Sequence, residues 1–382
     1  MDSASDQPVT AGAAAPTSRT PDSTLSAIVL AAGEGSRMRS DRPKPLHRLC
    51  GKPMLMYVVE SLAEVSAERA VIVVGHKGDW VTKKMQEHPH EVSVDFVEQR
   101  VQRGTGDATL VGLVGLPDED DEGDVLVLIG DAPLLRPSTI SALVSHHRAS
   151  GAAATMLTAI MEDPTGYGRI VRGREGRVER IVEQRDASAE ELEIAEVNTS
   201  IYCFRRNLLA PALRRVEPDN SQGEYYLTDV VEVLASAGHP IEAVVADDPA
   251  ETQGVNDRSQ LAVAEAELRR RTNRALLASG VTMVDPAAVY VDTTVVVGRD
   301  VTLFPGVILQ GSTVVGDRSE LGPETRLVDS VVGSDCVVER TTARNARIGD
   351  HCSVGPYAVL APGSEVPADS TTGPFYTAGP GL

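Results

Sequence analysis

The stretch "VLAAGEGSRMRSDRPKPL", from Val29 to Leu46, places a glycine-rich turn directly behind an apolar run that begins at Ser26. Such a run, closed by a turn, predicts a buried first strand over residues 26–32. In open α/β sheets, ligands bind at the carboxyl ends of the strands, which is where this turn lies. Glycines let backbone N–H groups approach phosphate oxygens closely. The stretch therefore predicts an α/β fold with an anion site behind its first strand.

The glycine turn fits neither of two common phosphate-binding motifs. A dinucleotide fingerprint requires a third glycine, and this chain has Met38 at that position. A P-loop requires Gly-Lys-Ser/Thr at the start of the next helix, and the chain lacks it. What remains is the turn 33–35, with Arg37 close behind it and Lys44 seven residues further on. Two cations beside several N–H donors suit a triphosphate or pyrophosphate, although the turn alone is equally compatible with an exposed basic loop.

Three further apolar runs predict strands at residues 69–75, 92–99 and 124–131. Pro53–Val65 is a candidate helix between the first two strands. Continuous apolar strands that alternate with helices are typical of a mostly parallel sheet covered on both faces. The first part of the chain is therefore predicted to be a Rossmann-like α/β domain.

A different pattern follows a long predicted helix over Asn256–Gly280, in which the glycine closes the carboxyl end. Aliphatic residues then recur every six positions, at Val297, Leu303, Leu309, Val315, Leu321 and Leu327. After a slip, the interval resumes at Ile348, Val354, Leu360 and Val366. A six-residue apolar repeat predicts a β-helix in which each hexad forms one side of a prism.

Composition limits the classes of partner. The net charge of −19 argues against nucleic acid, because its phosphate backbone would be repelled. The four cysteines match no metal spacing and suit reduced thiols in a cytoplasmic protein. No apolar stretch reaches the roughly 18 residues of a membrane span. Residues 1–24 lack an apolar core and are predicted to be a disordered tail rather than a signal peptide.

The segment Leu30–Met54 resembles the signature of sugar-1-phosphate nucleotidyltransferases. Later motifs follow in the family's order: "EQRVQRGTGDA", "LIGDAPLL", "DPTGYGRIV", "GRVERIVEQRDA", "EVNTSIYCF", "QGEYYLTD" and "QGVNDRSQL". More narrowly, the chain is similar to the uridyltransferase half of bacterial bifunctional N-acetylglucosamine-1-phosphate uridyltransferase/glucosamine-1-phosphate acetyltransferases. The resemblance implies a nucleotidyltransferase domain over 25–258, a linker helix over 259–280 and a left-handed parallel β-helix of hexapeptide repeats over 281–382.

The resemblance also implies a role for each matched residue. Arg37 and Lys44 would be catalytic, holding the nucleotide phosphates and neutralising the departing pyrophosphate. The nucleotide would be bound by Leu30, Ala31, Ala32, Gly33, Gln99, Gly104 and Thr105, with Gln99 at the uracil edge. Asp131 and Asn256 would ligate Mg²⁺. The amino sugar would be held by Gly168, Glu183, Asn198, Thr199 and Asn256.

Several of these residues have a second interpretation when they are taken alone. Asn256 is equally well explained as a helix N-cap, and both roles can coexist. Glu183 and Asn198 would each favour a surface or capping role. Asp131 suits a turn before Ala-Pro, but a carboxylate at a strand end also suits a hard, oxygen-seeking cation.

The implied chemistry is attack by the phosphate of N-acetylglucosamine 1-phosphate on the α-phosphorus of UTP. The attacking oxygen is already anionic, so the reaction requires no general base. Mg²⁺, Lys44 and Arg37 would position two anions and screen their repulsion. This accounts for a sequence without a His/Asp or Cys/His catalytic constellation.

The carboxyl-terminal segment departs from the family. The hexads stop near Val366, and Ala361-Pro362-Gly363 stands where Arg-Pro-Gly is usual. The resemblance therefore predicts uridyl transfer without acetyl transfer. It also implies a homotrimer that assembles through the β-helix. A shortened β-helix would pack less well in such a trimer.

Three departures concern the substrates. Asp107 replaces a histidine beside the base, Ile129 replaces an aromatic residue, and Ser200 follows Asn198-Thr199 where glycine is usual. Transfer to another sugar 1-phosphate, or from dTTP, therefore stays open. A non-catalytic scaffold or regulatory subunit of the same architecture also stays open, although an argument against it is the retention of Arg37, Lys44, Asp131 and Asn256.

Overall fold

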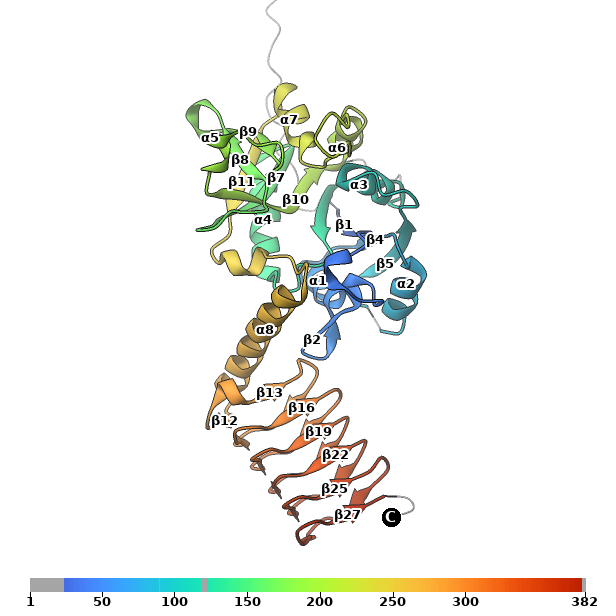
Figure 1. Ribbon diagram of the computed structural model, residues 1–382, viewed down its shortest axis with the longest axis vertical. Coiled ribbons are helices and arrows are strands. Elements are labelled where there is room, and N and C mark those ends of the chain that lie inside the picture. Colours follow the sequence, from blue (N-terminus) through green and yellow to red (C-terminus); the bar gives the residue numbers. More distant parts are fainter. Residues whose placement is uncertain (1–23, 89, 118–121, 380–382) are drawn as a thin grey trace, which may run out of the picture.

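The computed structural model describes residues 24–88, 90–117 and 122–379. It shows a sheet domain and a β-helix, joined by one long helix (Figure 1). The expected disordered tail, apart from Thr24, lies outside the described residues.

The sheet domain is built on a nine-stranded mixed sheet whose main path is β11-β7-β10-β6-β1-β4-β5. These strands are β1 (Leu25–Ala31), β4 (Arg69–Val74), β5 (Ser93–Glu98), β6 (Asp124–Ile129), β7 (Ala154–Ile160), β10 (Glu196–Arg205) and β11 (Ile241–Val245). The pairs β1/β4, β1/β6, β4/β5 and β7/β11 are parallel, whereas β10 runs antiparallel to β6 and β7. The predicted mostly parallel sheet is confirmed.

Two small strand pairs complete this domain. β8 (Arg169–Arg172) and β9 (Val178–Val182) form an antiparallel hairpin that joins the sheet through β10. β2 (Arg48–Leu49) and β3 (Lys52–Pro53) form a second hairpin that points toward the β-helix (Figure 1).

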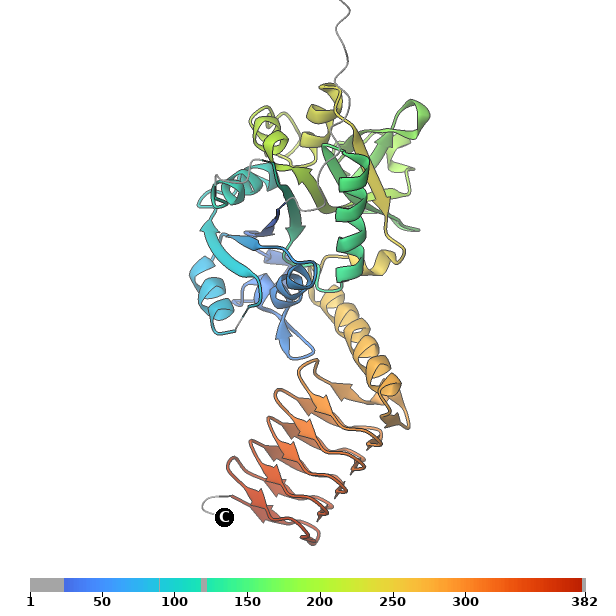
Figure 2. The same ribbon diagram turned by 180° about the vertical axis from the view of Figure 1, so that it is seen from behind.

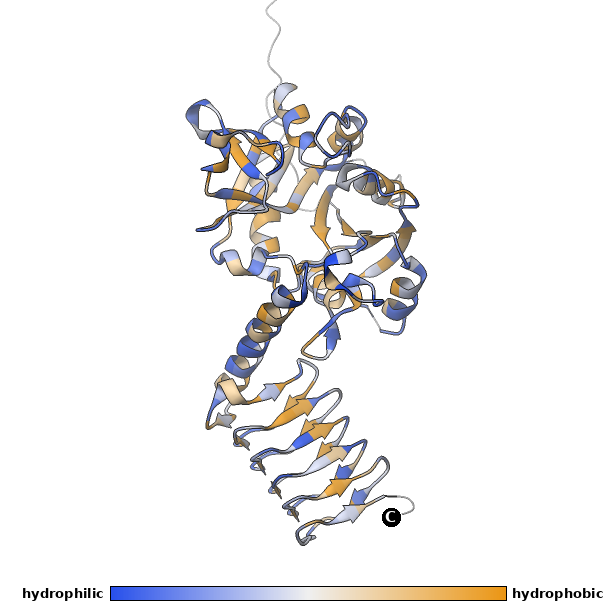
Figure 3. Cartoon of the chain, in the orientation of Figure 1, coloured by the Kyte–Doolittle hydropathy of each residue, from blue (hydrophilic) through white to orange (hydrophobic). Residues whose placement is uncertain are grey.

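Helices cover both faces of the sheet (Figure 2). One face is covered by α1 (Met54–Glu64), α2 (Gly78–Gln86) and α4 (Pro137–Ser150); the other is covered by α3 (Thr105–Val114), α6 (Arg206–Leu213) and α7 (Asp229–Ser236). Within β1, Ala27 and Val29 pack on the first face and Ile28 on the second. Because both faces are buried, the strands are apolar at consecutive positions, as Figure 3 shows. The short helix α5 (Ala189–Leu192) lies outside these layers.

The linking helix α8 runs over Arg258–Ala278, two residues shorter at each end than predicted. At its start, the side chain of Asp257 accepts a hydrogen bond from the backbone N–H of Gln260 at 2.9 Å. At its end, Gly280 takes a left-handed conformation with φ of 101° and donates to Leu277, while Val281 donates to Leu276. This Schellman arrangement confirms that the glycine closes the helix. No helix in the described part of the chain is long and apolar enough to cross a bilayer.

The β-helix consists of three stacks of short parallel strands, each stack forming one side of the prism. The first stack contains β12 (Thr282–Met283), β15 (Thr302–Leu303), β18 (Glu320–Leu321), β21 (Val337–Val338) and β24 (Ser353–Val354). The second contains β13 (Tyr290–Val291), β16 (Ile308–Gln310), β19 (Arg326–Val328), β22 (Thr342–Arg344), β25 (Val359–Leu360) and β27 (Thr377–Ala378). The third contains β14 (Val296–Val297), β17 (Val314–Val315), β20 (Val331–Val332), β23 (Arg347–Ile348) and β26 (Glu365–Val366).

The six-residue repeat corresponds to the inward side chains of these strands, which form one buried apolar column. The slip after Leu327 has a simple cause: three sides of the prism there are five residues long. They end at Val332, Ala343 and Ile348, all of which point inward and are buried. Strand partners that lie 18 residues apart earlier, such as Ile308 and Arg326, are therefore 16 apart here, as for Val331 and Arg347.

A second contact supports the junction between the two units. At the tip of the β2–β3 hairpin, the carbonyl oxygen of Cys50 accepts a hydrogen bond from the backbone N–H of Thr293 at 3.1 Å. The Tyr57 hydroxyl lies 3.2 Å from the Thr293 hydroxyl. The β-helix is thus attached to the sheet domain through α8 and through this hairpin.

Candidate functional site

A cavity of about 330 Å³ opens at the carboxyl ends of β1, β5 and β6. The turn after β1 forms one wall, and the start of α3 forms another. All seven residues assigned to the nucleotide line it, namely Leu30, Ala31, Ala32, Gly33, Gln99, Gly104 and Thr105. Lys44 and Asp131 also line it. We refer to this space as the nucleotide-side cavity.

A second cavity, of about 240 Å³, adjoins the first. It contains all the residues assigned to the sugar, namely Gly168, Glu183, Asn198, Thr199 and Asn256. Ile129 and Asp131 line both cavities. Asp131 therefore stands where two bound molecules would meet. We refer to this second space as the sugar-side cavity.

The predicted cations and oxygen ligands converge at this junction. The Lys44 ammonium forms an ion pair with Asp131 and donates to the side-chain oxygen of Asn256 at 2.9 Å. Arg37 donates to the same oxygen at 3.0 Å, although Arg37 is not among the residues that line either cavity. The side chains of Lys44 and Asp131 are only 17% and 16% exposed, so water screens their attraction weakly.

The donor set at the junction fits Mg²⁺. The described residues contain no group of three or more His, Cys, Asp or Glu side chains that could hold a metal. Mg²⁺ does not need one, because it keeps several waters and is commonly bound by one or two protein oxygens together with substrate phosphates. The Asp131 carboxylate and the Asn256 amide oxygen both contact a single cationic group, Lys44 Nζ, so they can converge on one positive charge.

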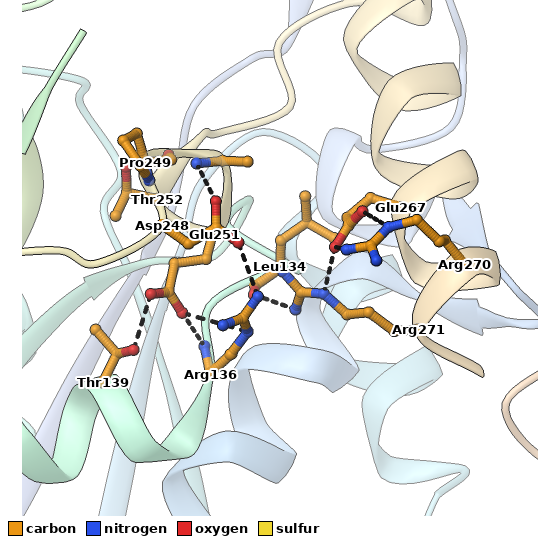
Figure 4. A network of polar contacts seen from close by, with 11 residues as sticks. Leu134, Arg136, Thr139, Asp248, Pro249, Glu251, Thr252, Glu267, Arg270 and Arg271 are labelled. Atoms are coloured by element: carbon orange, nitrogen blue, oxygen red, sulfur yellow. Dashed lines mark hydrogen bonds and ion pairs between the residues drawn. The ribbon is translucent and has the colours of Figure 1, made fainter. Parts of the chain in front are cut away.

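A polar network behind the junction fixes the two loops that carry these oxygens (Figure 4). Glu251, which is buried, accepts hydrogen bonds from the Arg136 backbone N–H at 3.2 Å and the Thr139 hydroxyl at 2.9 Å. Arg271 of α8 donates to the Leu134 carbonyl oxygen at 2.7 Å. A further hydrogen bond, from Val255 N–H to the Asp131 carbonyl oxygen at 2.9 Å, joins the loops directly.

The nucleotide-side cavity owes its shape to close backbone approach. Gly104 has φ of 110° and ψ of 177°, a region essentially restricted to glycine. A Cβ atom there would lie 2.5 Å from the Tyr225 carbonyl oxygen. Tyr225 also hydrogen-bonds to the backbone of Arg103 and Gly106, which fixes the start of α3 against this segment.

Carboxylates gather on one side of the sugar-side cavity. Burial raises the pKa of Glu183, whose side chain accepts a hydrogen bond from the Thr228 hydroxyl at 3.3 Å. Burial, with the neighbouring Glu232, Glu183 and Asp186, raises the pKa of Asp229 to about 6. The cavity thus offers a desolvated carboxylate acceptor, which suits hydroxyl and amide donors of a sugar.

The Asn198 side chain is held in one orientation. Its oxygen accepts from the Tyr202 hydroxyl at 2.9 Å and the Ser200 backbone N–H at 3.1 Å, which leaves its NH₂ group for a ligand acceptor. Thr199, in contrast, donates its hydroxyl to the Leu157 carbonyl oxygen at 2.7 Å. Ser200 itself has φ of 60°, at a bulge in the β10/β7 pairing. A glycine would adopt this conformation without strain.

Other residues line the cavities without having been assigned a role. They include Gln102 and Glu224 on the nucleotide side, and Tyr167, Thr252 and Gly254 on the sugar side. Gln102 reaches back to donate to the Ala32 carbonyl oxygen at 2.6 Å. All of them except Thr252 lie inside the family motifs of the sequence. The motifs could therefore have indicated these residues, although their residue types alone did not.

Comparisons with known proteins identify the family of the chain. A family model described as nucleotidyl transferase matches residues 26–250. The bifunctional protein GlmU of Corynebacterium efficiens is 42% identical over 356 residues, covering 93% of this chain and 73% of that protein. The protein of the same name from Pelotomaculum thermopropionicum is 44% identical over 354 residues, covering 92% of this chain and 75% of that protein.

Proposed function

The chain belongs to the nucleotidyl transferase family, together with the bifunctional GlmU proteins, and we propose that it transfers a uridylyl group from UTP to N-acetylglucosamine 1-phosphate. The products would be UDP-N-acetylglucosamine and pyrophosphate. The observation that carries this proposal is the meeting of two cavities at Asp131 and Lys44. One cavity suits a nucleotide and the other a sugar phosphate, so the reacting phosphates would meet beside Asp131, which lines both.

The residues at the junction provide positioning and charge rather than proton transfer. The attacking phosphate oxygen is already anionic, so Lys44 and Arg37 act by holding two anions together. Positioning of this kind can lower a barrier by about 7–11 kcal/mol. Mg²⁺, held by Asp131 and Asn256, would supply further neutralisation of the phosphates. The network around Glu251 keeps the two oxygen-bearing loops in register.

The proposal also specifies the identity of the base, uracil, and of the sugar, an N-acetylated amino sugar. Gln99 at the nucleotide-side cavity is the candidate for the base. Glu183 and the NH₂ group of Asn198 offer an acceptor and a donor for sugar hydroxyls and the acetamido group.

The proposal is tested by measuring pyrophosphate release from the purified chain with Mg²⁺, UTP and a panel of sugar 1-phosphates. N-acetylglucosamine 1-phosphate should give the highest kcat/KM. A preference for another sugar, or for dTTP, would replace the substrate assignment. Absence of turnover with every pair would favour a scaffold or regulatory subunit.

The same assay tests the junction. Lys44→Ala should lower kcat by about 100- to 1,000-fold, because it removes a preorganised charge from the reacting phosphates. Lys83→Ala, at an exposed lysine of helix α2 that lines neither cavity, is the matched control and should retain full activity. A loss of only a few-fold in Lys44→Ala would contradict the assigned role.

We also propose that residues 281–382 do not add acetyl transfer, because the short neutral side chain of Ala361 cannot bind an anionic cofactor as arginine would. The proposal fails if the chain acetylates glucosamine 1-phosphate with acetyl-CoA. Residues 25–258 would carry the uridylyl transfer, and residues 259–280 would act only as the link.

A homotrimer through the β-helix is proposed on the outward side chains of its third stack. Val296, Val314 and Val331 stand next to one another there and form an apolar row, with Val296 60% exposed. Light scattering should give three chains per particle, and Val314→Glu should lower that number. We also propose a cytoplasmic location, because that is where UTP and sugar 1-phosphates would be available as substrates.

A further inference from the structure

One side chain of the nucleotide-side cavity, Gln99, is held in a fixed orientation. Gln99 follows β5 directly, and its backbone N–H donates to the Val74 carbonyl oxygen at 2.8 Å. The residue is only 5% exposed, and it lines the cavity. The position of its amide group is therefore set by the protein rather than by solvent.

The two partners of the amide determine which of its ends faces them. Gln99 Nε2 donates to Asp107 Oδ2 at 2.7 Å and to the Gly104 carbonyl oxygen at 3.2 Å. A carboxylate and a carbonyl oxygen can only accept hydrogen bonds. The reversed amide would place Gln99 Oε1 against two acceptors, so it is excluded on chemical grounds. Oε1 is left as the polar atom available to the cavity.

Asp107 occupies a position behind Gln99. It lies in the first turn of α3, where the helix dipole favours a negative charge. It is not among the residues that line the nucleotide-side cavity. Any effect of Asp107 on a bound base would therefore pass through the Gln99 amide.

We propose that Asp107 is a positioning residue that determines which bases the nucleotide-side cavity accepts. By holding Gln99 Nε2, it presents Oε1, an acceptor, to the base. Uracil and thymine carry a ring N–H at N3, whereas cytosine has a lone pair there. The fixed amide therefore selects a uracil- or thymine-type edge over cytosine. This inference rests on the proposed use of the cavity for a nucleoside triphosphate.

The test uses Asp107→Asn in the full chain, with UTP and CTP binding measured by calorimetry in the presence of Mg²⁺ and without sugar. The new amide has the same shape but can donate or accept, so only the longer contact with the Gly104 carbonyl oxygen, at 3.2 Å, still opposes the reversed orientation of Gln99. The ratio of the CTP to the UTP dissociation constant should fall at least about 10-fold. Asp219→Asn, at an exposed carboxylate, is the matched control and should leave the ratio unchanged.

A second variant separates positioning from simple loss of structure. Gln99→Glu alone would set two carboxylates against each other and weaken the binding of both nucleotides. In Gln99→Glu/Asp107→Asn, the amide at position 107 donates to one oxygen of the carboxylate at position 99. This shorter, charge-assisted bond outweighs the longer contact of that oxygen with the Gly104 carbonyl, and the other oxygen again faces the base. The preference for UTP should recover at least about 10-fold relative to Asp107→Asn.

The inference is overturned if folded Asp107→Asn keeps the wild-type ratio, or if the double variant fails to recover it. It is also overturned if the wild-type chain binds UTP no tighter than CTP. Selective UTP binding without turnover of any sugar 1-phosphate would instead refute the proposed function and leave the role of Asp107 standing. Thermal unfolding of each variant establishes that it is folded.

Discussion

The two cavities that meet at Asp131 are built in different ways. The nucleotide-side cavity is shaped by backbone: strand ends, a glycine turn, and the contact of Gly104 with Tyr225. The sugar-side cavity is shaped by side chains such as Glu183, directly after β9, and Asn198, within β10. The difference teaches that this chain would bind phosphate and ribose with its backbone and would recognise a sugar with individual side chains. Changes in the two cavities should therefore have different consequences.

The largest expected effect is on the backbone-built cavity. Gly104→Ala would strain a glycine-only conformation and press a methyl group against the Tyr225 carbonyl oxygen, lowering the free energy of unfolding by about 3 kcal/mol. Displacement of the start of α3 should also lower kcat/KM for UTP by about 100-fold. Denaturant titration and initial rates measure the two effects.

Gly33→Ala is the matched comparison within the same cavity. Apart from its chain neighbours, a Cβ atom at Gly33 would have no protein atom within 4 Å, so the free energy of unfolding should not fall and should rise by up to about 1 kcal/mol through the stiffer unfolded chain. Only UTP affinity should fall, because the added methyl group occupies space offered to the phosphates. Equal destabilisation by the two variants would contradict the view that Gly104 shapes the fold and Gly33 shapes the ligand space.

A smaller and more selective effect is expected in the sugar-side cavity. Glu183→Gln should raise KM for the sugar 1-phosphate about 10-fold, because hydrogen bonds to a charged acceptor are stronger than those to a neutral one. KM for UTP should stay the same. Glu175→Gln, at an exposed carboxylate, is the control. A parallel change in both KM values would show that the cavities are not separable.

The carboxylates beside the sugar-side cavity should make stability depend on pH. The pKa of Asp229 is raised to about 6 in the folded chain, so folding is favoured by its protonated form. This contribution to stability is lost as the pH rises from about 4 through about 6. Asp229→Asn should therefore stabilise the chain more at pH 8 than at pH 5, by about 1 kcal/mol after allowance for partial exposure.

Thermal unfolding of both proteins at the two pH values gives this difference. The comparison between variant and wild type cancels the titration of groups elsewhere. An equal gain at pH 5 and pH 8 would mean that burial does not penalise the Asp229 carboxylate.

The smallest effect is expected at Ser200. The left-handed conformation of Ser200 destabilises the folded chain by about 1 kcal/mol relative to glycine. Replacement by glycine relieves this strain, but the greater conformational freedom of glycine in the unfolded chain offsets part of the gain. Ser200→Gly should therefore stabilise the chain by about 0.5 kcal/mol. Ser200→Ala keeps the strain and should give no gain in chemical denaturation. Such a gain in the alanine variant would assign the effect to the hydroxyl group instead.

The same contrast between backbone and side chains explains what sequence could predict. Apolar runs and the turn after Ala31 indicated the sheet and the anion site, because strand ends and glycines leave a local pattern. The six-residue repeat indicated the β-helix, but the five-residue sides ending at Val332 and Ala343 appeared only as a slip. Their inward positions depend on pairing between coils, which one sequence does not display.

The sugar-side residues had no such local pattern. Glu183 and Asn198 line one cavity only because β8 pairs with both β9 and β10, and resemblance to a family was the sole reason to select them. The bonds of Lys44 to Asp131 and Asn256 join residues far apart in the chain. The orientation of Gln99 depends on Asp107, whose type suggested altered base contacts but not which atoms would make them.

The length of helix α8 sets the direction in which the β-helix leaves the sheet domain. It is 21 residues long, it begins two residues after Asn256, and the β-helix beyond it is held a second time by the contact between Cys50 and Thr293. Each residue added to a helix advances it by about 1.5 Å and turns it by about 100°. An insertion of one residue would swing the β-helix away from that contact, whereas seven or eleven residues would nearly restore its direction. Such insertions would still carry the β-helix about 10 or 16 Å along the helix axis, so the contact between Cys50 and Thr293 matches only the present length of α8.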